Sequence, residues 1–425
     1  MQKRIIRVLT CSLVLSLLVS GVVPALVLCA EKTVEITMWD IDWSDPVHSS
    51  MKYFVPWFEK YQQHILPGIS VSKDYGPSNY PEAKKKFIIQ AKTGYPDIRT
   101  TITENCFTFL GMKLVGPLTD RFNAWDEKGQ FYESAIKAVT VEGEIVAIPY
   151  NVHARALLYR KDIFAQLGLT PPQTWKELID FGSKITANVP DMYGFAIANK
   201  KLDPRAFQSF MSWFYQVNGR ENLFKKVGGK WTVNATPEKL AKVLQLYYDL
   251  LFGTDPSAMN PGDRGLGYPG LDSGYEAGRF AMAPEGPWME HYTVVPQNSD
   301  VAPLPTPEGV KPAAYMEVEV RFMNKFSKNK DETWKVLQYL LSSEIMSIIN
   351  VRSGDISPRK DAVMTEWQAK WAKLVPLGVS LAPVIWDPVR VDIGDAVDKV
   401  TYKQGTPAEV GKWLYEQLKE KAKQF

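Results

Sequence analysis

The sequence predicts an α/β fold built as two lobes, each a sheet flanked by helices. Two observations lead to this prediction. Short apolar stretches of strand length alternate along the chain with longer stretches whose apolar residues recur at helical spacing, which is typical of α/β proteins. The chain also has 425 residues, of which 395 follow the first 30, and a single hydrophobic core rarely organises so many.

Residues 1–30 have the layout of a secretory signal peptide, with basic residues first and then an apolar run that contains small residues and Pro24. A retained membrane anchor is the alternative, but Pro24 interrupts the run and the chain turns polar at Glu31. Cys29 would allow lipid anchoring, although Leu28 is larger than the residue that usually precedes a lipoprotein cysteine. No later apolar stretch has the length of a membrane span. We therefore expect a secreted protein in the periplasm or another extracytoplasmic space.

Charge and cysteine content exclude several classes of function. Residues 1–30 hold three of the 50 basic side chains and none of the 47 acidic ones, so the rest of the chain is close to neutral. Nothing in this balance suggests a nucleic-acid partner, which would need a basic patch. Cys106 is then the only cysteine, or one of two if Cys29 is retained, so neither a disulfide framework nor a cysteine metal site can form. The four histidines lack ligand spacing, and we expect no metal and no cofactor.

The first lobe is predicted to contain three strands and two helices, in the order strand 34–38, helix 51–62, strand 69–75, helix 82–92 and strand 97–102. Open α/β sheets bind ligands at the carboxyl ends of their strands. Trp39, Asp40 and Trp43 follow the first strand at that end, and Glu104 follows the third. Tyr80 lies in the loop before the second helix. These five residues are candidates for ligand binding.

A joint between the lobes is predicted directly after a hairpin. Glu142-Gly143 predicts the hairpin turn, and 145–148 a short strand that Pro149 ends, because proline has no N–H for the ladder. Tyr150-Asn151 follows as an irregular joint through which the chain enters the second lobe. Asn151 is either a ligand contact or a residue that stabilises this hinge.

The second lobe is predicted to open with a strand at 156–159 and helices at 161–168 and 175–185. Gly168 closes the first of these helices in the way that helix C-termini usually close. Thr174 with Glu177 three residues later forms a capping box that starts the second.

Several short segments carry a shared pattern, namely Gly-Tyr-Pro-Asp at 94–97, Ile-Pro-Tyr-Asn at 148–151, Tyr-Arg-Lys-Asp at 159–162, Phe-x-x-x-Gly at 164–168, Pro-x-Thr-Trp-x-Glu at 172–177, Gly-Arg-Phe-Ala-Met at 278–282, Gly-Pro-Trp at 286–288 and Ser-Gly-Asp-Ile-Ser-Pro-Arg-Lys-Asp at 353–361. In these segments the chain resembles family 1 of the extracellular solute-binding proteins of ABC importers. The segments agree with the family in order and spacing, and together they cover most of the chain after residue 30.

The resemblance implies the type II periplasmic-binding-protein fold, with three hinge crossings and a ligand bound in the cleft between the lobes. It assigns 31–148 and 316–354 to the N-lobe, and 149–315 and 355–425 to the C-lobe. It also implies a monomer without catalytic residues, which delivers its ligand to the transmembrane subunits of an ABC permease. The hinge segments would absorb the backbone rotation when the lobes close.

Further elements along the chain are predicted as a helix at 239–252, a loop at 255–274, a short helix at 275–280, strands at 281–283, 301–304 and 314–323, a helix at 330–343 and helices to the end with a break at 376–388. Phe207, Phe210 and Phe214 fit one helical face, which leaves Trp213 to point elsewhere. Trp288 sits at a helix start in the Gly-Pro-Trp segment, where the family places a ring that stacks on the ligand.

The positions of the tryptophans indicate which chemical class of ligand the protein binds. Five tryptophans fall at predicted loops or element ends, namely Trp39, Trp43, Trp213, Trp288 and Trp386. A pyranose presents C–H faces to such rings and hydroxyl groups to acids and amides. The polar candidates are Asp40, Glu104, Asn151, Asp355 and Glu317. The predicted ligand is a mono- or oligosaccharide.

One carboxylate pair leaves an enzymatic alternative open. Glu317, Glu319 and Arg321 alternate along a predicted strand and share one face, and a glycoside hydrolase needs two carboxylates beside the sugar bond. We favour a charged row in which Arg321 compensates Glu319. Met316-Glu317 also departs from the small residues that most relatives carry at this crossing, which suggests a ligand whose hydroxyls or amino group face an acid.

Other ligands of a transport protein also remain open, namely a polyol, a sugar phosphate or an amino compound. A phosphate would need basic residues in the cleft, for which the candidates are Arg155, Arg321 and Arg352. The segment 265–270 has dinucleotide-fingerprint spacing, but Pro269 disrupts the helix that such a motif must open.

Overall fold

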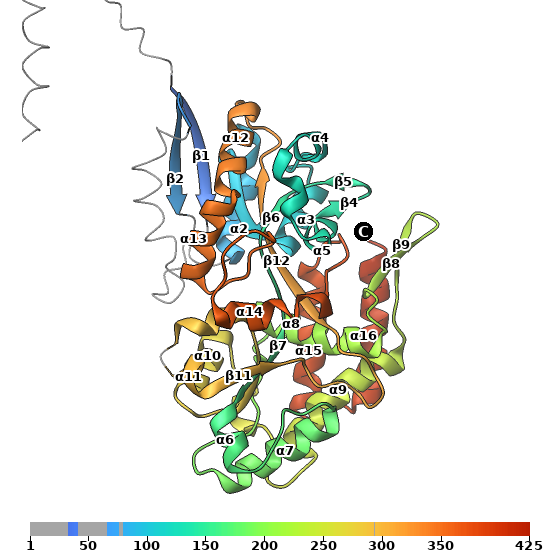
Figure 1. The fold of residues 1–425 in the computed structure, drawn as a ribbon. Helices are drawn as coiled ribbons and strands as arrows, with labels where there is room; N and C mark the ends of the chain where they lie inside the picture. Colours follow the sequence, from blue (N-terminus) through green and yellow to red (C-terminus); the bar gives the residue numbers. More distant parts are fainter. Residues whose placement is uncertain (1–32, 41–65, 76–79, 293) are drawn as a thin grey trace, which may run out of the picture.

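A computed structural model of the chain describes residues 33–40, 66–75, 80–292 and 294–425 (Figure 1). Outside the described residues lie the predicted signal peptide with Cys29, the predicted helix at 51–62, and Trp43. The backbone alone is described for Asp40, Tyr80 and Arg352.

The first lobe is built on a six-stranded sheet of order β13-β12-β3-β1-β2, in which β6 also pairs with β12. β1 runs parallel to β2 and β3, whereas β12 runs antiparallel to β3 and β6. The strands are β1 (Val34–Asp40), β2 (Ile69–Tyr75), β3 (Ile98–Ile102), β6 (Ile148–Ala154), β12 (Ala314–Met323) and β13 (Gly378–Val379).

Helices and one hairpin surround this sheet (Figure 1). They are α2 (Tyr80–Gln90), η1 (Ala91–Thr93), α3 (Thr103–Gly111), α4 (Thr119–Asn123), η2 (Asp126–Gln130), α5 (Glu133–Ala138), the hairpin β4 (Thr140–Val141) and β5 (Glu144–Ile145), α12 (Lys330–Leu340) and α13 (Ser343–Ser353).

The second lobe has a three-stranded antiparallel sheet of order β10-β7-β11, with strands β7 (Ala156–Arg160), β10 (Met282–Glu285) and β11 (Ser299–Ala302). Its longer helices are α7 (Trp175–Asn188), α8 (Pro204–Val217), α9 (Pro237–Phe252), α15 (Asp387–Thr401) and α16 (Pro407–Ala422). Shorter elements are α6 (Lys161–Gln166), the hairpin β8 (Phe224–Val227) and β9 (Lys230–Val233), η3 (Pro261–Asp263), α10 (Tyr268–Glu276), η4 (Pro287–His291), α11 (Val295–Asn298), α14 (Glu366–Ala372) and η5 (Val375–Leu377).

The buried apolar residues of the described part of the chain form two hydrophobic clusters. The first centres on the large sheet, where the rings of Phe87, Phe109 and Phe322 contact one another with centroids 4.6 to 5.8 Å apart. The second lies among the helices of the second lobe and includes Trp213 and Trp386. Burial of such large rings supplies the main favourable term for folding each lobe.

Local sequence signals predict several elements correctly. The strands predicted at 69–75 and 314–323 have these bounds in β2 and β12. The predicted hairpin turn is confirmed, with positive φ angles of 54° at Glu142 and 87° at Gly143. The capping box is also confirmed, because Glu177 N donates to Thr174 Oγ1 at 3.1 Å and Thr174 N donates to Glu177 Oε2 at 3.1 Å.

The prediction that Pro149 ends a strand is wrong. β6 begins at Ile148 and continues through Pro149 to Ala154. The pairing with β12 shifts register between Glu319 and Val320, so that Tyr150 bulges and Pro149 stands beside the irregularity. Strands accommodate proline at such bulges, because a ladder hydrogen bond is already missing there.

One prediction in the second lobe also needs correction. The segment predicted as a loop over 255–274 contains most of α10, whose bounds Tyr268–Glu276 replace the predicted helix at 275–280. On α8, Trp213 is fully buried and its ring contacts that of Trp175 in the second cluster.

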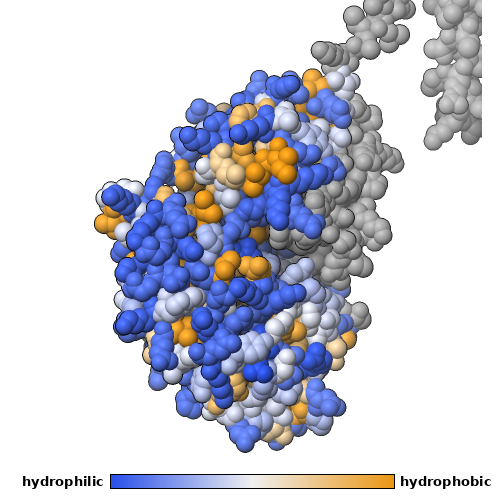
Figure 2. All heavy atoms as spheres, turned by 180° about the vertical axis from the view of Figure 1, so that it is seen from behind, coloured by the Kyte–Doolittle hydropathy of each residue, from blue (hydrophilic) through white to orange (hydrophobic). Residues whose placement is uncertain are grey.

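The helices and the surface can be compared with those of membrane-spanning proteins in length and hydropathy. Among the helices of the described residues, none combines the length and the apolar composition that a bilayer span requires. The face in Figure 2 is mainly hydrophilic, with hydrophobic residues in small separate groups.

We predict that Thr174→Ala lowers the free energy of unfolding by about 1 kcal/mol, because the first turn of α7 loses its side-chain cap. Urea unfolding measures this change. Thr170→Ala is the matched control at an exposed position outside the helix and should have almost no effect. Equal losses in both variants would show that the capping box contributes nothing.

Candidate functional site

The two sheets meet where β6 passes into β7 and where β12 begins. Arg155 is the single residue between β6 and β7, and its backbone N–H donates to the Tyr315 carbonyl on β12 at 3.0 Å. Further along the same pair of strands, Glu317 lies opposite His153. Directly opposed residues of antiparallel strands bring their side chains together. Polar side chains from both lobes therefore gather at this junction.

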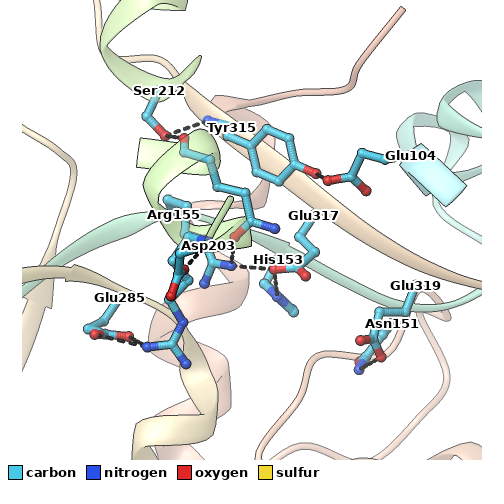
Figure 3. Close-up of polar contacts among 12 residues, drawn as sticks. Glu104, Asn151, His153, Arg155, Asp203, Ser212, Glu285, Tyr315, Glu317 and Glu319 are labelled. Carbon is cyan, nitrogen blue, oxygen red and sulfur yellow. Dashed lines mark hydrogen bonds and ion pairs between the residues drawn. The ribbon is translucent and has the colours of Figure 1, made fainter. Parts of the chain in front are cut away.

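Glu317 lies at the centre of the first group of contacts (Figure 3). It contacts His153 Nε2 at 3.1 Å and accepts a hydrogen bond from Arg155, which also donates to Gln208 on α8. Burial opposes ionisation of Glu317, but the Arg155 charge and the His153 hydrogen bond outweigh it and lower its pKa to about 2. The carboxylate is thus ionised and already compensated by protein groups.

Glu104 and Tyr315 form a second contact across the junction. The Tyr315 hydroxyl donates to Glu104 Oε1 at 2.8 Å, which ties the start of β12 to the first turn of α3 (Figure 3). Burial raises the pKa of Glu104, with the Arg390 charge opposing it. Burial and the neighbouring Glu104 raise the pKa of Tyr315 well above its usual range. Burial therefore disfavours the charged form of both groups.

Arg205 on α8 organises a third group. Its guanidinium donates to Asp272 Oδ2 at 3.0 Å and to the two carboxyl oxygens of Glu285 at 3.2 and 3.0 Å. Asp203, the N-cap of α8, accepts from the Arg205 backbone N–H at 2.8 Å and fixes the start of the helix. Burial raises the pKa of Glu285 well above its usual range, although Arg205 opposes this. Two carboxyl groups thus share one cation.

Trp288 connects the first and third groups. The guanidinium carbons of Arg155 and Arg205 lie 4.5 and 4.6 Å from its ring centroid, and the His153 ring meets it edge-on at 5.1 Å. The ring also folds back over Gly286, where a Cβ would come within 1.9 Å of it. Glycine is therefore required in the Gly-Pro-Trp segment because any side chain would displace the indole.

Glu319 is a meeting point of all three predicted crossings. It accepts hydrogen bonds from Tyr150 and, at 3.2 Å, from Asn151 Nδ2, both on β6. Burial and then the charges of Asp355 and Glu317 raise its pKa to about 8. Its neighbour Arg321, which we expected to compensate it, donates to the Leu340 carbonyl at 3.1 Å and lies over the Tyr150 ring. Glu319 is therefore mainly protonated at neutral pH.

Several buried polar atoms of the junction have no hydrogen-bond partner within the described part of the chain. They are Glu104 Oε2, Asn151 Oδ1, His153 Nδ1, Arg155 Nε and Nη1, and Trp288 Nε1. Leaving a buried polar group unsatisfied costs about 1–3 kcal/mol, so such atoms mark places where a ligand can bind. Within the described residues no group of His, Cys, Asp and Glu is arranged to hold a metal ion.

The structure brings some of the predicted site residues together and separates others. Four of them lie at the junction, namely Glu104, Asn151, Trp288 and Glu317. Asp355 is half-buried and acts on Glu319 through its charge. Trp39 is fully buried at the end of β1, where Arg99 and Lys86 lie over its ring. Trp213 and Trp386 are buried in the second core, where Trp386 donates to the Ala382 carbonyl at 2.8 Å.

Sequence reasoning missed most of the charged residues at the junction. The missed residues are His153, Arg205, Gln208, Asp272 and Glu285, and Arg155 was considered only as a phosphate contact. A usable signal was present, because Glu285 ends an apolar strand and directly precedes Gly-Pro-Trp. Charged residues inside apolar strands are rarely buried unless they are paired.

We predict that Arg155→Met lowers the free energy of unfolding by about 3–5 kcal/mol, because Glu317 would remain buried without its cation. Urea unfolding measures the loss. The double variant with Glu317→Gln should recover a large part of it. Lys176→Met is the control, since it removes an exposed pair with Asp180 and should cost less than about 1 kcal/mol. A double variant no more stable than Arg155→Met would contradict the pairing.

We predict that Glu319 makes the protein less stable as pH rises from about 4.5 to about 8. Its pKa is raised on folding, so its contribution is complete below the unfolded value of 4.5 and is lost as pH rises through the folded value of about 8. Glu319 lowers the free energy of unfolding by at most about 1.4 kcal/mol for each pH unit in this range. Glu319→Gln, which keeps the acceptor for Tyr150, should remove this part of the slope.

The free energy of unfolding is measured in urea at pH 5 to 9 for the wild type and for Glu319→Gln. The difference between the two proteins is followed with pH, because the contributions of all other acids cancel in it. Above about pH 8 the variant should be the more stable protein. Glu308→Gln at an exposed loop position is the control. A constant difference across this range would refute a protonated Glu319.

Comparison with known proteins identifies the family. The model of the family of bacterial extracellular solute-binding proteins matches residues 45–347. A binding protein of Brucella abortus is 25% identical over 371 residues, which cover 84% of this chain and 87% of that protein.

Two solved structures show the same fold. The maltose-bound MalE3 protein of T. maritima has a TM-score of 0.76 at 22% identity and covers 91% of this chain and 100% of its own. A solute-binding protein of Agrobacterium radiobacter in complex with ribitol has a TM-score of 0.74 at 21% identity and covers 92% and 99%. The fold is therefore the two-lobed α/β fold of type II periplasmic binding proteins, as the sequence predicted. The chain belongs to the family of bacterial extracellular solute-binding proteins and is a solute-binding protein of ABC transporters.

Proposed function

We propose that this protein binds a mono- or oligosaccharide at the junction between its lobes and delivers it to the transmembrane subunits of an ABC permease. The observation that carries the proposal is the set of buried, unpartnered polar atoms of Glu104, Arg155 and Trp288 at that junction. They combine donors and an acceptor in one place. A sugar matches such a mixture, because each hydroxyl group both donates and accepts.

The charge balance of the site favours an uncharged ligand. Arg155 is paired with Glu317, and Arg205 is shared between Asp272 and Glu285. A phosphate group would add negative charge beside these carboxylates, since both guanidinium groups already have an acidic partner. An amino compound would likewise meet an ionised Glu317 that Arg155 already compensates. We therefore rank neutral carbohydrates first among the possible ligands.

A polyol is the second candidate. The Agrobacterium structure is a complex with ribitol, whereas the T. maritima protein holds maltose. Polyols present the same hydroxyl chemistry as sugars but lack the flat C–H face of a pyranose. A ring face at Trp288 would therefore discriminate between the two classes.

We assign ligand contacts to Glu104, Asn151 and Trp288, and a supporting role to Glu317, which holds Arg155 in place. Asp355, Trp39, Asp40, Trp43 and Tyr80 remain predictions from the sequence. Secretion through the signal peptide at 1–30 would place the protein outside the cytoplasm, where we expect it to act as a monomer.

A glycoside hydrolase that uses Glu317 and Glu319 is the less favoured alternative. The family and the structural neighbours are binding proteins rather than enzymes. Each carboxyl group is also engaged in its own buried contacts, Glu317 with Arg155 and His153 and Glu319 with Tyr150 and Asn151.

The test is thermal unfolding of the purified protein against a panel of mono-, di- and oligosaccharides, polyols, sugar phosphates and amino sugars. A ligand at about a hundred times its Kd should add about 2.7 kcal/mol of stability, which raises Tm by several degrees. Trp288→Ala should lose this shift. Trp413→Ala is the matched control, because that ring is partly exposed on α16 outside the junction.

Chromatography of the mixture after incubation separates binding from catalysis. Recovery of the unchanged sugar supports a binding protein, whereas conversion that disappears in Glu317→Gln would replace our proposal with the hydrolase. A shift with sugar phosphates and none with neutral sugars would overturn the charge argument. An equal loss of the shift in Trp288→Ala and Trp413→Ala would remove Trp288 from the site.

A further inference from the structure

Two ion pairs join the lobes away from the strands that connect them. The first involves Lys84 on α2 of the first lobe and Asp387, the first residue of α15 in the second lobe. Thr108 on α3 completes this contact, since Lys84 Nζ donates to its hydroxyl at 3.2 Å and that hydroxyl donates to Asp387 Oδ2 at 3.4 Å. Two elements of the first lobe thus hold one carboxylate of the second.

The second ion pair joins two hairpins. Glu142 lies at the turn of β4–β5 in the first lobe, and Lys226 lies on β8 in the second. Figure 1 shows the β8–β9 hairpin standing out from the second lobe on the side where β4 and β5 lie in the first. The hydrogen bond from Lys226, together with its charge, lowers the pKa of Glu142.

Local structure prepares both partners for these contacts. Asp387 stands at the N-terminus of α15, where a carboxylate is favoured by the unpaired N–H groups of the first turn. Glu142 adopts a φ angle of 54° in the hairpin turn, which projects it from the lobe surface, and its side chain is 71% exposed. Neither residue needs its interlobe partner in order to hold its backbone conformation.

These pairs depend on how the lobes are placed. The connections between the lobes pass through the β6–β7 joint, β12 and the segment after α13. A rotation of one lobe about these connections would leave the internal contacts of each lobe intact but would separate Lys84 from Asp387 and Lys226 from Glu142. The pairs therefore belong to one relative placement of the lobes.

We propose that the two ion pairs form a latch that stabilises the placement of the lobes seen in this structure and makes this placement sensitive to salt. The Lys226–Glu142 pair is exposed on both sides, whereas in the Lys84–Asp387 pair the acid is 50% exposed and the lysine 13%. Ion pairs that water reaches contribute little to global folding, and each is expected to change an equilibrium only a few-fold. The balance between open and closed lobes is itself small, so two pairs together can change it by about tenfold. This proposal concerns lobe placement alone and does not depend on which ligand binds.

The test is small-angle X-ray scattering of the purified protein without added sugar. The radius of gyration is measured at about 0.01 M and about 1 M NaCl, where the Debye length is about 30 Å and about 3 Å. The latch variant is Glu142→Gln with Asp387→Asn, which removes both pairs with little change of shape. The matched control is Asp180→Asn with Glu416→Gln, which removes two exposed pairs that each lie within one helix.

We expect the wild type and the control to expand when salt is raised, and the latch variant to be expanded already at low salt. The double variant Lys226→Glu with Glu142→Lys exchanges the charges of one pair and keeps the pair itself. At low salt its radius of gyration should equal that of the wild type. Identical radii for the wild type and the latch variant at both salt concentrations would overturn the proposal. A control that is as expanded as the latch variant at low salt would also overturn it, because the effect would then follow net charge rather than the interlobe pairs.

Discussion

The structure depends on one buried ion pair, Arg155 with Glu317, at the place where the chain leaves one sheet and enters the other. Arg155 is the residue between β6 and β7, and Glu317 lies on β12, which pairs with β6. Burying both charges is costly, and the cost is offset only when the pair is close and its remaining hydrogen bonds are satisfied. His153 and Gln208 satisfy part of them, from the first and the second lobe respectively. The pair therefore ties the geometry of the joint to the contents of the site.

Protonation states divide the carboxyl groups of the junction into two kinds. Glu317 is ionised because Arg155 and His153 outweigh the effect of burial, whereas Glu104, Glu285 and Glu319 have raised pKa values. With a pKa of about 8, Glu319 can donate as well as accept a hydrogen bond at neutral pH. Glu317 and Arg155, and Arg205 with its two acids, form compensated groups, so the junction is not an exposed field of one sign.

The lobes are held together by interactions of two strengths. Deep in the junction, β12 pairs with strands on both sides and holds Glu317 and Glu319 among buried groups. At the surface, exposed pairs such as Lys226 with Glu142 are screened by water and salt. The first kind fixes how the lobes fit together. The second kind is weak enough to be broken and re-formed while each lobe stays folded.

The sequence by itself determined the α/β class, the family and most elements with a strong local signal. β2 and β12 had clear apolar patterns, the Thr174 capping box had a specific spacing, and the Glu142-Gly143 turn favoured positive φ angles. These features depend on residues within a few positions of one another, so they can be read along the chain. Tertiary structure alone decided the rest. Pro149 stays in β6 because of a bulge opposite another strand, and Trp213 is buried because α9, α15 and β12 pack around α8. Arg205, Asp272 and Glu285 meet only because α8, α10 and β10 converge, although Asp272 and Glu285 lie 67 and 80 positions after Arg205 in the sequence. No local pattern encodes such a contact, since its energy comes from desolvation and from partners that only the folded chain brings together.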